Sequence, residues 1–369
     1  MWLNFFSAWV LVGHVILFTP SASAWEQESW RAYADKFVQA DGRVIDYAVS
    51  PGITTSEGQA YALLRAVWSD DRAVFDRVLA WTTRNLAREG SPLPAWKWGA
   101  LAAGGWGVVD ANTASDADVI LALALYSAAQ KWNVPELEGR AREIAQAVWD
   151  EEVVQIAGRW YLLPGKWARD FQPIPLNLSY YSPAFLRRLA TLDPEHPWKA
   201  VASSTYRLLE TRLPLTELPP DWMSIDPANG VVALGGIDGA LRAQFGHDAY
   251  RVYWNLALDY AWDRSEPAKR YLTSQTWLAR YLALNGTLPR EVSPDAIPRL
   301  SGPEPLALYG SLYPGFLLFD RKAAAAARAQ IDAAYKEGIW GARADYYEQN
   351  IVWFGMALGE GRFPPFEPK

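Results

Sequence analysis

The segment TTSEGQAYALLRAV, residues 54–67, guides the interpretation of the whole chain because it places one carboxylic acid at the start of an otherwise apolar helix. Ala60, Leu63 and Leu64 recur at helical spacing, which predicts an amphipathic helix whose first turn carries Thr, Ser and Glu. The acid, Glu57, is therefore expected at the mouth of this helix.

Two interpretations of Glu57 follow from the segment. Thr54 and Glu57 form a T-x-x-E pattern, which is typical of a capping box that satisfies free backbone amides at a helix start. Alternatively, apolar and aromatic neighbours disfavour the charged carboxylate and keep Glu57 protonated near neutral pH, as a general acid requires. Partners elsewhere in the chain must decide between the two.

The composition indicates a globular protein that handles a flat, partly apolar ligand. The chain has 369 residues, of which 50% are hydrophobic and 21% charged, enough for one large domain or two ordinary ones. Twenty Trp and eighteen Tyr suit the stacking of sugar rings. A net charge of -6 argues against nucleic acid or an anionic membrane as partner. The absence of Cys excludes disulfides and thiol chemistry, and three His leave little material for a metal site, so we expect no metal or cofactor.

The first residues read as a targeting segment. The apolar run WLNFFSAWVLVGHVILFT, residues 2–19, is followed by PSASA, which puts an A-x-A pattern directly before Trp25. This predicts a cleaved secretory signal over residues 1–24 and a single domain over residues 25–369. An uncleaved membrane anchor is the alternative, disfavoured because the run is short and interrupted by polar residues and glycine.

The mature chain alternates helical patterns with short connections and predicts an all-α fold. A closed (α/α)6 barrel of six helical hairpins and an open solenoid both suit about twelve helices in sequential pairs. A solenoid should repeat with a period of about 34 to 47 residues, and no such period is present, so we predict the barrel, with a few short strands in its loops. The strand-like pieces are residues 43–46 and 160–163. The predicted helices cover residues 26–38, 57–68, 72–87, 116–132, 135–149, 183–191, 197–211, 248–262, 266–284, 305–312, 321–336 and 345–357.

Several tryptophans stand in Pro- and Gly-rich connections, where a helix interface cannot easily bury them. Trp96, Trp98 and Trp106 lie in two such loops, and Trp167 and Trp222 repeat the arrangement further along the chain. Each one alone could close a loop onto the barrel end. Together they predict an aromatic platform for carbohydrate.

Two further carboxylates are expected at helix starts. Asp116 and Asp118 open the fourth helix, and Asp248 opens another with Arg251 one turn later, within reach to keep Asp248 ionised. An Asp at a helix start is commonly a cap or a partner of the helix dipole. In a barrel of parallel hairpins, however, these positions and Glu57 would face the same end. One protonated and one ionised carboxyl are the groups that hydrolyse a glycosidic bond.

At this point the motifs resemble those of glycoside hydrolase family 8. TTSEGQ at 54–59 is similar to the general-acid segment of that family, ASDAD at 114–118 to its signature, and DAYR at 248–251 to the segment that supplies the base. The resemblance covers residues 25–355, nearly all of the mature chain. Further landmarks are LPAW at 93–96, LLPG at 162–165, PDW at 220–222, Tyr346 with Tyr347, and Phe354 with Gly355.

The resemblance implies a role for each matching residue. Glu57 would be the general acid, Asp248 the base that activates water, and Asp116 the contact to the distorted sugar, with Arg251 and Tyr180 supporting the base and the water. It also implies an (α/α)6 barrel and an inverting reaction without a covalent nucleophile. The residues expected to bind substrate are Trp96, Trp98, Trp106, Trp167, Tyr181 and Trp222.

A few positions depart from the family pattern. Leu121 and Tyr126 replace residues of the signature, Leu178 replaces the usual proline of an N-P-S-Y loop, and His247 stands where Tyr is usual. None of these changes removes a catalytic carboxyl.

The resemblance implies an endo-β-1,4-glucanase that acts on a β-1,4-glucan chain of the cellulose type. It is strongest to members encoded with bacterial cellulose synthases, which implies a periplasmic or secreted protein and makes the cellulose synthase export machinery a candidate partner. Xylan, chitosan and mixed-linkage glucan remain alternative substrates. A noncatalytic glucan-binding scaffold is a further alternative, although it would be expected to lose Glu57 or Asp248, and both are present.

Overall fold

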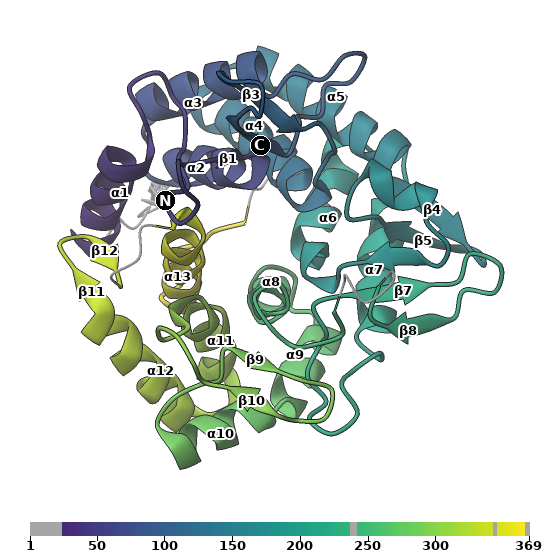
Figure 1. Ribbon diagram of the computed structural model, residues 1–369, viewed down its shortest axis with the longest axis vertical. Helices are drawn as coiled ribbons and strands as arrows, with labels where there is room; N and C mark the ends of the chain where they lie inside the picture. Colours follow the sequence, from purple (N-terminus) through teal and green to yellow (C-terminus); the bar gives the residue numbers. More distant parts are fainter. Residues whose placement is uncertain (1–23, 237–241, 342–344, 366–369) are drawn as a thin grey trace, which may run out of the picture.

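The computed structural model describes residues 24–236, 242–341 and 345–365, and its helices form two concentric rings (Figure 1). Each inner helix packs against the next, and the last packs against the first, so the inner ring is closed. An open solenoid is thereby excluded, and the predicted (α/α)6 barrel is confirmed. The inner helices are α2 (Ser56–Trp68), α4 (Ser115–Trp132), α6 (Pro183–Leu192), α8 (Tyr250–Asp263), α11 (Leu306–Phe319) and α13 (Tyr346–Gly359).

The outer helices cover the inner ring, and most pack on an inner neighbour, whereas α10 packs on the outer helix α12. The first helix, α1, packs against the last, α13, so the two ends of the chain complete one hairpin pair. None of the described helices is long and apolar enough to span a lipid bilayer. The outer helices are α1 (Ala24–Phe37), α3 (Arg72–Asn85), α5 (Pro135–Glu152), α7 (Trp198–Leu208), α9 (Glu266–Ser274), α10 (Trp277–Asn285) and α12 (Arg321–Ala334).

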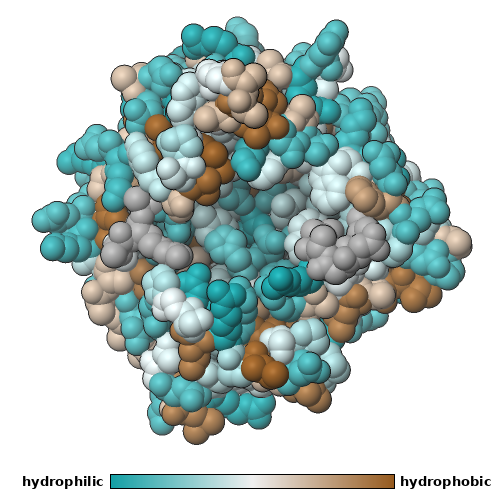
Figure 2. All heavy atoms as spheres, in the orientation of Figure 1, coloured by the Kyte–Doolittle hydropathy of each residue, from teal (hydrophilic) through white to brown (hydrophobic). Residues whose placement is uncertain are grey.

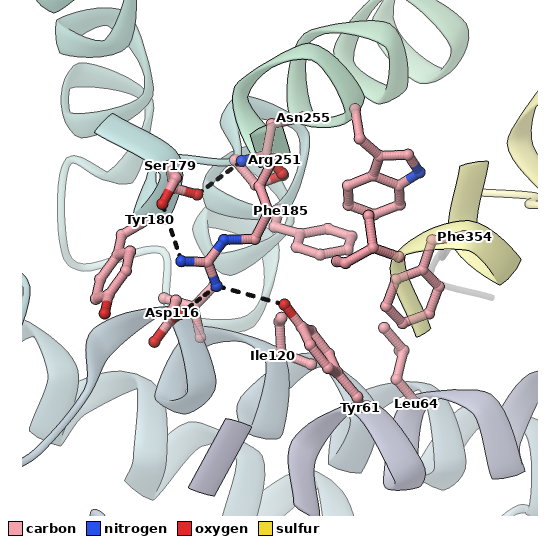
Figure 3. A pocket seen from close by; sticks show the side chains of 14 residues that line it. Tyr61, Leu64, Asp116, Ile120, Ser179, Tyr180, Phe185, Arg251, Asn255 and Phe354 are labelled. Atoms are coloured by element: carbon pink, nitrogen blue, oxygen red, sulfur yellow. Dashed lines mark hydrogen bonds and ion pairs between the residues drawn. The ribbon is translucent and has the colours of Figure 1, made fainter. Parts of the chain in front are cut away.

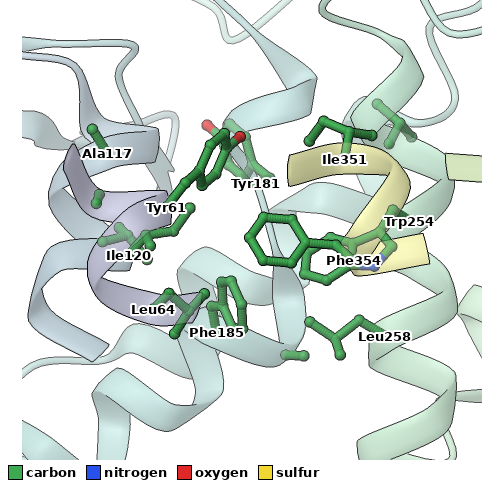
Figure 4. Close-up of a cluster of buried hydrophobic side chains, with 14 of the residues drawn as sticks. Tyr61, Leu64, Ala117, Ile120, Tyr181, Phe185, Trp254, Leu258, Ile351 and Phe354 are labelled. Carbon is green, nitrogen blue, oxygen red and sulfur yellow. The ribbon is translucent and has the colours of Figure 1, made fainter. Parts of the chain in front are cut away.

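The core lies where the inner helices turn their apolar sides toward the barrel axis. Tyr61 and Leu64 of α2 meet Phe185 of α6 and Phe354 of α13 there (Figure 4), and all four are almost inaccessible to solvent. Inner helices are buried nearly all round, whereas outer helices bury one stripe only. This explains why the inner helices are the more apolar ones in sequence.

Short antiparallel strands occupy the connections; the piece predicted at 160–163 belongs to one of them, whereas the piece at 43–46 forms only isolated bridges. The first sheet pairs Thr54 of β1 with Trp98 of β2, and Trp98 with Val108 of β3, so a hairpin is attached to the start of α2. The strands are β1 (Thr54–Thr55), β2 (Lys97–Ala100), β3 (Trp106–Asp110), β4 (Val153–Ile156), β5 (Arg159–Leu162), β6 (Ile174–Leu176), β7 (Met223–Ile225), β8 (Val232–Leu234), β9 (Glu291–Val292), β10 (Pro298–Arg299), β11 (Tyr335–Lys336) and β12 (Ile339–Trp340). Figure 2 shows a hollow near the middle of the ring, lined mostly by hydrophilic residues.

Two predicted helices differ from the structure. The helix expected over 266–284 is two helices, α9 and α10, because Gln275 has ψ near 75° and the Ser274 hydroxyl returns to the carbonyl of Tyr271. The helix expected to end at residue 312 continues to Phe319 with Pro314 inside it. Pro314 has no N–H for the carbonyl of Gly310, and helix α13 packs directly against that carbonyl.

The start of α2 is also arranged differently from the capping-box interpretation. Thr55 is the N-cap, and its hydroxyl accepts the N–H of Gly58. Thr54 instead donates to the carbonyl of Val44. The carboxyl of Glu57 takes no part in capping and is free for another role.

Candidate active site

One arginine joins the three predicted carboxylates. The guanidinium of Arg251, in the first turn of α8, donates from Nη1 to Glu57 and to Asp116 (2.7 Å), and from Nη2 to Asp248 (3.0 Å). Nη1 also lies 3.5 Å from the hydroxyl of Tyr61 (Figure 3). A single positive charge therefore faces three carboxyl groups that come from two inner helices and the turn before a third. With all three carboxyls ionised the site would carry an excess negative charge, which favours a proton on one of them.

Glu57 has the properties of a proton donor at this site. Its side chain is 16% exposed, against 27% for Asp248. The pKa of Glu57 is raised to about 8, chiefly by burial and also by the neighbouring Asp116, while Arg251 and the hydroxyl of Tyr346 act in the opposite direction. Glu57 can therefore hold a proton at neutral pH and donate it.

Asp248 does not begin α8 as predicted but lies in the turn before it, since the helix starts at Tyr250. Two contacts fix this turn: the N–H of Ala249 donates to Asp221 (2.9 Å), and the hydroxyl of Tyr347 donates to the carbonyl of His247 (2.7 Å). Burial and the charge of Asp248 raise the pKa of Asp221 to about 7. The turn holds Asp248 at the more exposed side of the site, where a base can meet water.

His247 packs against the site through its ring. Its ring centre lies 3.9 Å from that of Tyr347, whose hydroxyl holds the turn of Asp248. His247 thus occupies the place of an aromatic residue beside the base.

The loop in which Leu178 replaces proline keeps its form. Asn177 caps the short 3-10 helix Leu178–Tyr180, and its side chain accepts from both the N–H and the hydroxyl of Ser179. The Ser179 hydroxyl in turn accepts from Nη2 of Arg251 (3.0 Å). The loop therefore supports the arginine.

Three of the predicted aromatic residues form a row that starts at the arginine. The guanidinium of Arg251 lies 5.2 Å from the ring centre of Tyr180. Trp222 follows at 6.4 Å from Tyr180, and Trp167 at 6.3 Å from Trp222. All three rings are partly exposed. This row offers a surface on which sugar rings can stack.

Two other tryptophans form a separate group on the β2–β3 hairpin. Trp98 and Trp106 stack at 5.3 Å, and Arg43 lies 4.4 Å from the ring centre of Trp98. Trp81 contacts Trp98 edge-on, so Trp98 is enclosed on several sides, whereas Trp106 is 47% exposed. Trp106 is thus the member of this group that a ligand can reach.

The other two aromatic predictions have different outcomes. Trp96 is partly buried, and its backbone carbonyl accepts the N–H of Ser56 beside Glu57. The prediction that Tyr181 binds substrate is wrong for this structure: its side chain is buried in the core and its hydroxyl donates to the carbonyl of Leu162. Because Tyr180 faces the site, the next residue, Tyr181, points to the opposite side of the chain.

Sequence reasoning did not assign a role to two tyrosines at the site. The hydroxyl of Tyr346 donates to Glu57 (2.9 Å) and shares a hydrogen bond with Thr55 (2.6 Å). Tyr61 lies one helical turn after Glu57 on the inner side of α2, and this spacing could have predicted that Tyr61 lies beside Glu57. Tyr346 was marked only as a family landmark, and nothing local shows that it reaches Glu57.

The described residues contain no group of three or more His, Asp or Glu that could hold a metal ion. His196 lies against Asp193 (2.7 Å) and stacks on Trp149, which gives it a structural role.

A closed helical barrel that holds a carboxyl of raised pKa, a second carboxyl and an aromatic row is suited to the hydrolysis of a glycosidic bond. The comparisons with known proteins agree. The profile of "Glycosyl hydrolases family 8" matches residues 4–292. The endoglucanase of Xanthomonas axonopodis pv. citri (strain 306) is 34% identical over 348 residues, which cover 90% of this chain and 85% of that protein. This chain belongs to family 8 of the glycoside hydrolases.

Two further similarities extend over the same length. The endoglucanase of Escherichia coli (strain K12) is 31% identical over 346 residues, which cover 91% of this chain and 88% of that protein. The crystal structure of an endo-1,4-D-glucanase from Vibrio fischeri ES114 has a TM-score of 0.75 at 25% identity and covers 89% of this chain and 93% of that one.

Proposed function

We propose that this glycoside hydrolase is an endo-β-1,4-glucanase that cleaves cellulose-type glucan with inversion at the anomeric carbon. The observation that carries the proposal is the single guanidinium shared by three carboxyl groups, of which Glu57 is the one whose pKa is raised to about 8. The names of the relatives support β-1,4-glucan as substrate.

In the proposed reaction Glu57 protonates the oxygen of the departing sugar, and Asp248 removes a proton from the attacking water. The two carboxyls bind different nitrogens of Arg251. Inversion requires a separation of roughly 6.5–9.5 Å. Asp116 would orient the distorted sugar at the cleavage point, and Tyr180 would lie beside the water.

The aromatic groups would bind the sugars on either side of the cut. Trp167 and Trp222 extend from Tyr180 and Arg251, so they are suited to sugars close to the reacting bond. Trp106, on the hairpin that pairs with the start of α2, is suited to a sugar at the other side of Glu57, with Trp96 and Trp98 supporting it.

The test is incubation of the purified protein with carboxymethylcellulose, xylan, chitosan and mixed-linkage glucan, followed by chromatography of the products. We expect carboxymethylcellulose to shorten rapidly to oligosaccharides, and Glu57→Gln to slow this by about 10²-fold or more. Faster cleavage of xylan or chitosan would show that this polysaccharide, and not cellulose-type glucan, is the substrate, and the protein would still be a glycoside hydrolase. Binding of glucan without cleavage in the unaltered protein would indicate the noncatalytic scaffold.

Export is a second part of the proposal. Residues 1–23 lie outside the described part, and the proposed cleavage after Ala24 would release a periplasmic or secreted protein that begins at Trp25. The indole of Trp25 donates to Glu360 (3.0 Å), so this residue is already part of the folded domain. Intact mass of the exported protein tests the cleavage, whereas co-purification with the cellulose synthase export machinery tests that candidate partner.

A further inference from the structure

A fully buried arginine lies where the first and last inner helices meet. Arg65 stands on α2, two turns after Glu57, and its side chain is 0% exposed. Its guanidinium donates from Nη1 to the side-chain oxygen of Asn350 on α13 (3.3 Å) and from Nη2 to the backbone carbonyl of Ser29 on α1 (3.4 Å). Both acceptors are neutral oxygens, one on each neighbouring helix.

Three aromatic rings surround the same guanidinium. The ring centres of Tyr33, Trp353 and Trp30 lie 4.5 Å, 4.9 Å and 5.5 Å from it. These rings come from α1 and α13, and their faces attract a cation. Burying a charge costs free energy even among such partners. A buried polar contact of this kind can fix one relative position of the elements that it joins.

Asn350 extends the contact of Arg65 to the first residue of α13. Its side-chain amide, which is 0% exposed, donates to the carbonyl of Tyr346 one turn earlier (2.7 Å) and to the hydroxyl of Tyr33 (3.2 Å). The hydroxyl of Tyr346 in turn donates to Glu57 (2.9 Å). Helices α2 and α13 are therefore joined by two side-chain contacts, one at Glu57 and one at Arg65.

Side-chain contacts have to set the position of α13 against α2. The two helices are neighbours in the inner ring (Figure 1), but one is the first inner helix of the chain and the other is the last. No short loop can therefore fix their relative position, as it does within a helical hairpin. A displacement of about 1 Å at this contact would break the hydrogen bond from Tyr346 to Glu57, since O–H···O bonds span about 2.5–3.0 Å.

We propose that Arg65 and Asn350 are positioning residues: their buried hydrogen bond holds the start of α13 against α2, so that the hydroxyl of Tyr346 reaches the general acid. Neither residue contacts substrate in this account. The hydrogen bond from Tyr346 lowers the pKa of Glu57 and so opposes the effect of burial. The kinetic part of this inference rests on the proposed function, whereas the titration of Glu57 can be followed without substrate.

The test measures the apparent pKa of Glu57 by NMR of protein with isotope-labelled glutamate carboxyls, in which Glu57→Gln identifies the signal. Tyr346→Phe removes the hydroxyl and should raise this pKa by about one unit, since the carboxylate loses a donor. The double variant Arg65→Met/Asn350→Leu replaces the buried polar pair by apolar side chains, which proteins often tolerate without loss of stability. It should raise the pKa of Glu57 as much as Tyr346→Phe does.

The route through Tyr346 is tested by combining the changes. Tyr346→Phe added to the double variant should move the pKa of Glu57 no further, because both changes remove the same hydrogen bond. Gln349→Leu is the matched control. Gln349 is also a buried amide of α13, but it bonds both backbone groups of Trp340. Its loss should leave the titration of Glu57 unchanged.

The kinetic readout follows the same proton. On cello-oligosaccharides the alkaline fall of kcat/KM should move to higher pH in Tyr346→Phe and in the double variant, by as much as the pKa of Glu57 does. The other titratable groups around Glu57 stay the same in every variant. They are Arg251 of α8, Asp116 of α4, Tyr61 of α2, Tyr33 of α1, Tyr347 of α13 and Tyr180 of the loop before α6.

Several outcomes would overturn the inference. An unaltered titration of Glu57 in Tyr346→Phe or in the double variant would do so, as would an equal shift in Gln349→Leu. A further increase in the combined variant would show that the charge of Arg65 acts on Glu57 by another route. If the unaltered protein cleaves no polysaccharide, the proposed function fails, and the NMR titration still decides whether Arg65 is a positioning residue.

Discussion

At Glu57, burial and an arginine act in opposite directions on the same proton. The guanidinium of Arg251 favours the charged carboxylate, whereas removal from water and the adjacent Asp116 disfavour it. Burial is the largest of these effects, so the proton is retained. The arginine then serves mainly to align the three carboxyls, each of which it contacts.

The first prediction concerns pH. Because Glu57 must be protonated to act as an acid, kcat/KM should fall as pH rises through about 8. The same raised pKa contributes stability that is complete below the ordinary pKa and is lost toward pH 8. Glu57→Gln should therefore show weaker pH dependence in both the residual kcat/KM and the free energy of unfolding. An alkaline decline that persists unchanged in Glu57→Gln would assign it to another group.

The second prediction concerns the base. Asp248→Asn keeps the shape of the side chain but cannot accept a proton from water, so turnover should fall by about 10²-fold or more while oligosaccharide still binds. Proton NMR of freshly cleaved cello-oligosaccharide should show the α-anomer first in the unaltered enzyme. An initial β-anomer would contradict direct attack by water.

Sequence motifs predicted the side chains of the site that lie within them, but they did not predict one side chain that only the folded structure places there. Glu57, Asp116, Asp248 and Arg251 meet as expected. Tyr346 donates to Glu57 from 289 residues away. No local pattern specifies which partner a distant tyrosine will find.

At the scale of elements, two tryptophans of the β2–β3 hairpin are expected to have different roles, one in substrate binding and one in stability. Trp106 is 47% exposed, while Trp98 is packed between Trp81, Trp106 and Arg43. We predict that Trp106→Ala weakens oligosaccharide binding by about tenfold with little change in Tm. Trp98→Ala should lower the free energy of unfolding by about 2 kcal/mol. Titration calorimetry and thermal melts measure the two effects, and normal binding in Trp106→Ala would remove this ring from the substrate path.

The contact between α11 and α13 permits another prediction. A Cβ on Gly355 would lie 1.9 Å from the carbonyl oxygen of Gly310, so Gly355→Ala forces the two inner helices apart. It should cost about 1–3 kcal/mol or more in chemical denaturation. Gly139 lies exposed within α5 with nothing near its Cβ position. Gly139→Ala, the matched control, should stabilise the protein by roughly 0.5–1 kcal/mol.

Local pattern predicted most helices but not every boundary. Amphipathic spacing located α3 and α5, because their buried faces repeat with the helical period. It did not find the break at Gln275, since the apolar period continues across it. It also ended α11 too early, because proline normally stops a helix, and the compensating contact of Gly310 with Gly355 lies far away in sequence.

At the scale of the whole molecule, the closed inner ring makes each helical hairpin depend on two neighbours. An open array can unfold from its ends, but this ring has none. We predict a single heat-absorption peak in scanning calorimetry, with van 't Hoff and calorimetric enthalpies in agreement. Two resolved peaks would contradict a single domain over residues 25–369.

Ring closure also determines the order in which the protein can be completed. Helix α2 packs against α13, although nearly the whole chain separates them. During synthesis α2 leaves the ribosome long before α13 exists, so one of its apolar sides has no partner until the end. Contacts between such distant segments form slowly, and exposed apolar surface invites aggregation meanwhile. We therefore expect the apolar side of α2 that faces α13 to stay exposed until the last inner helix is made.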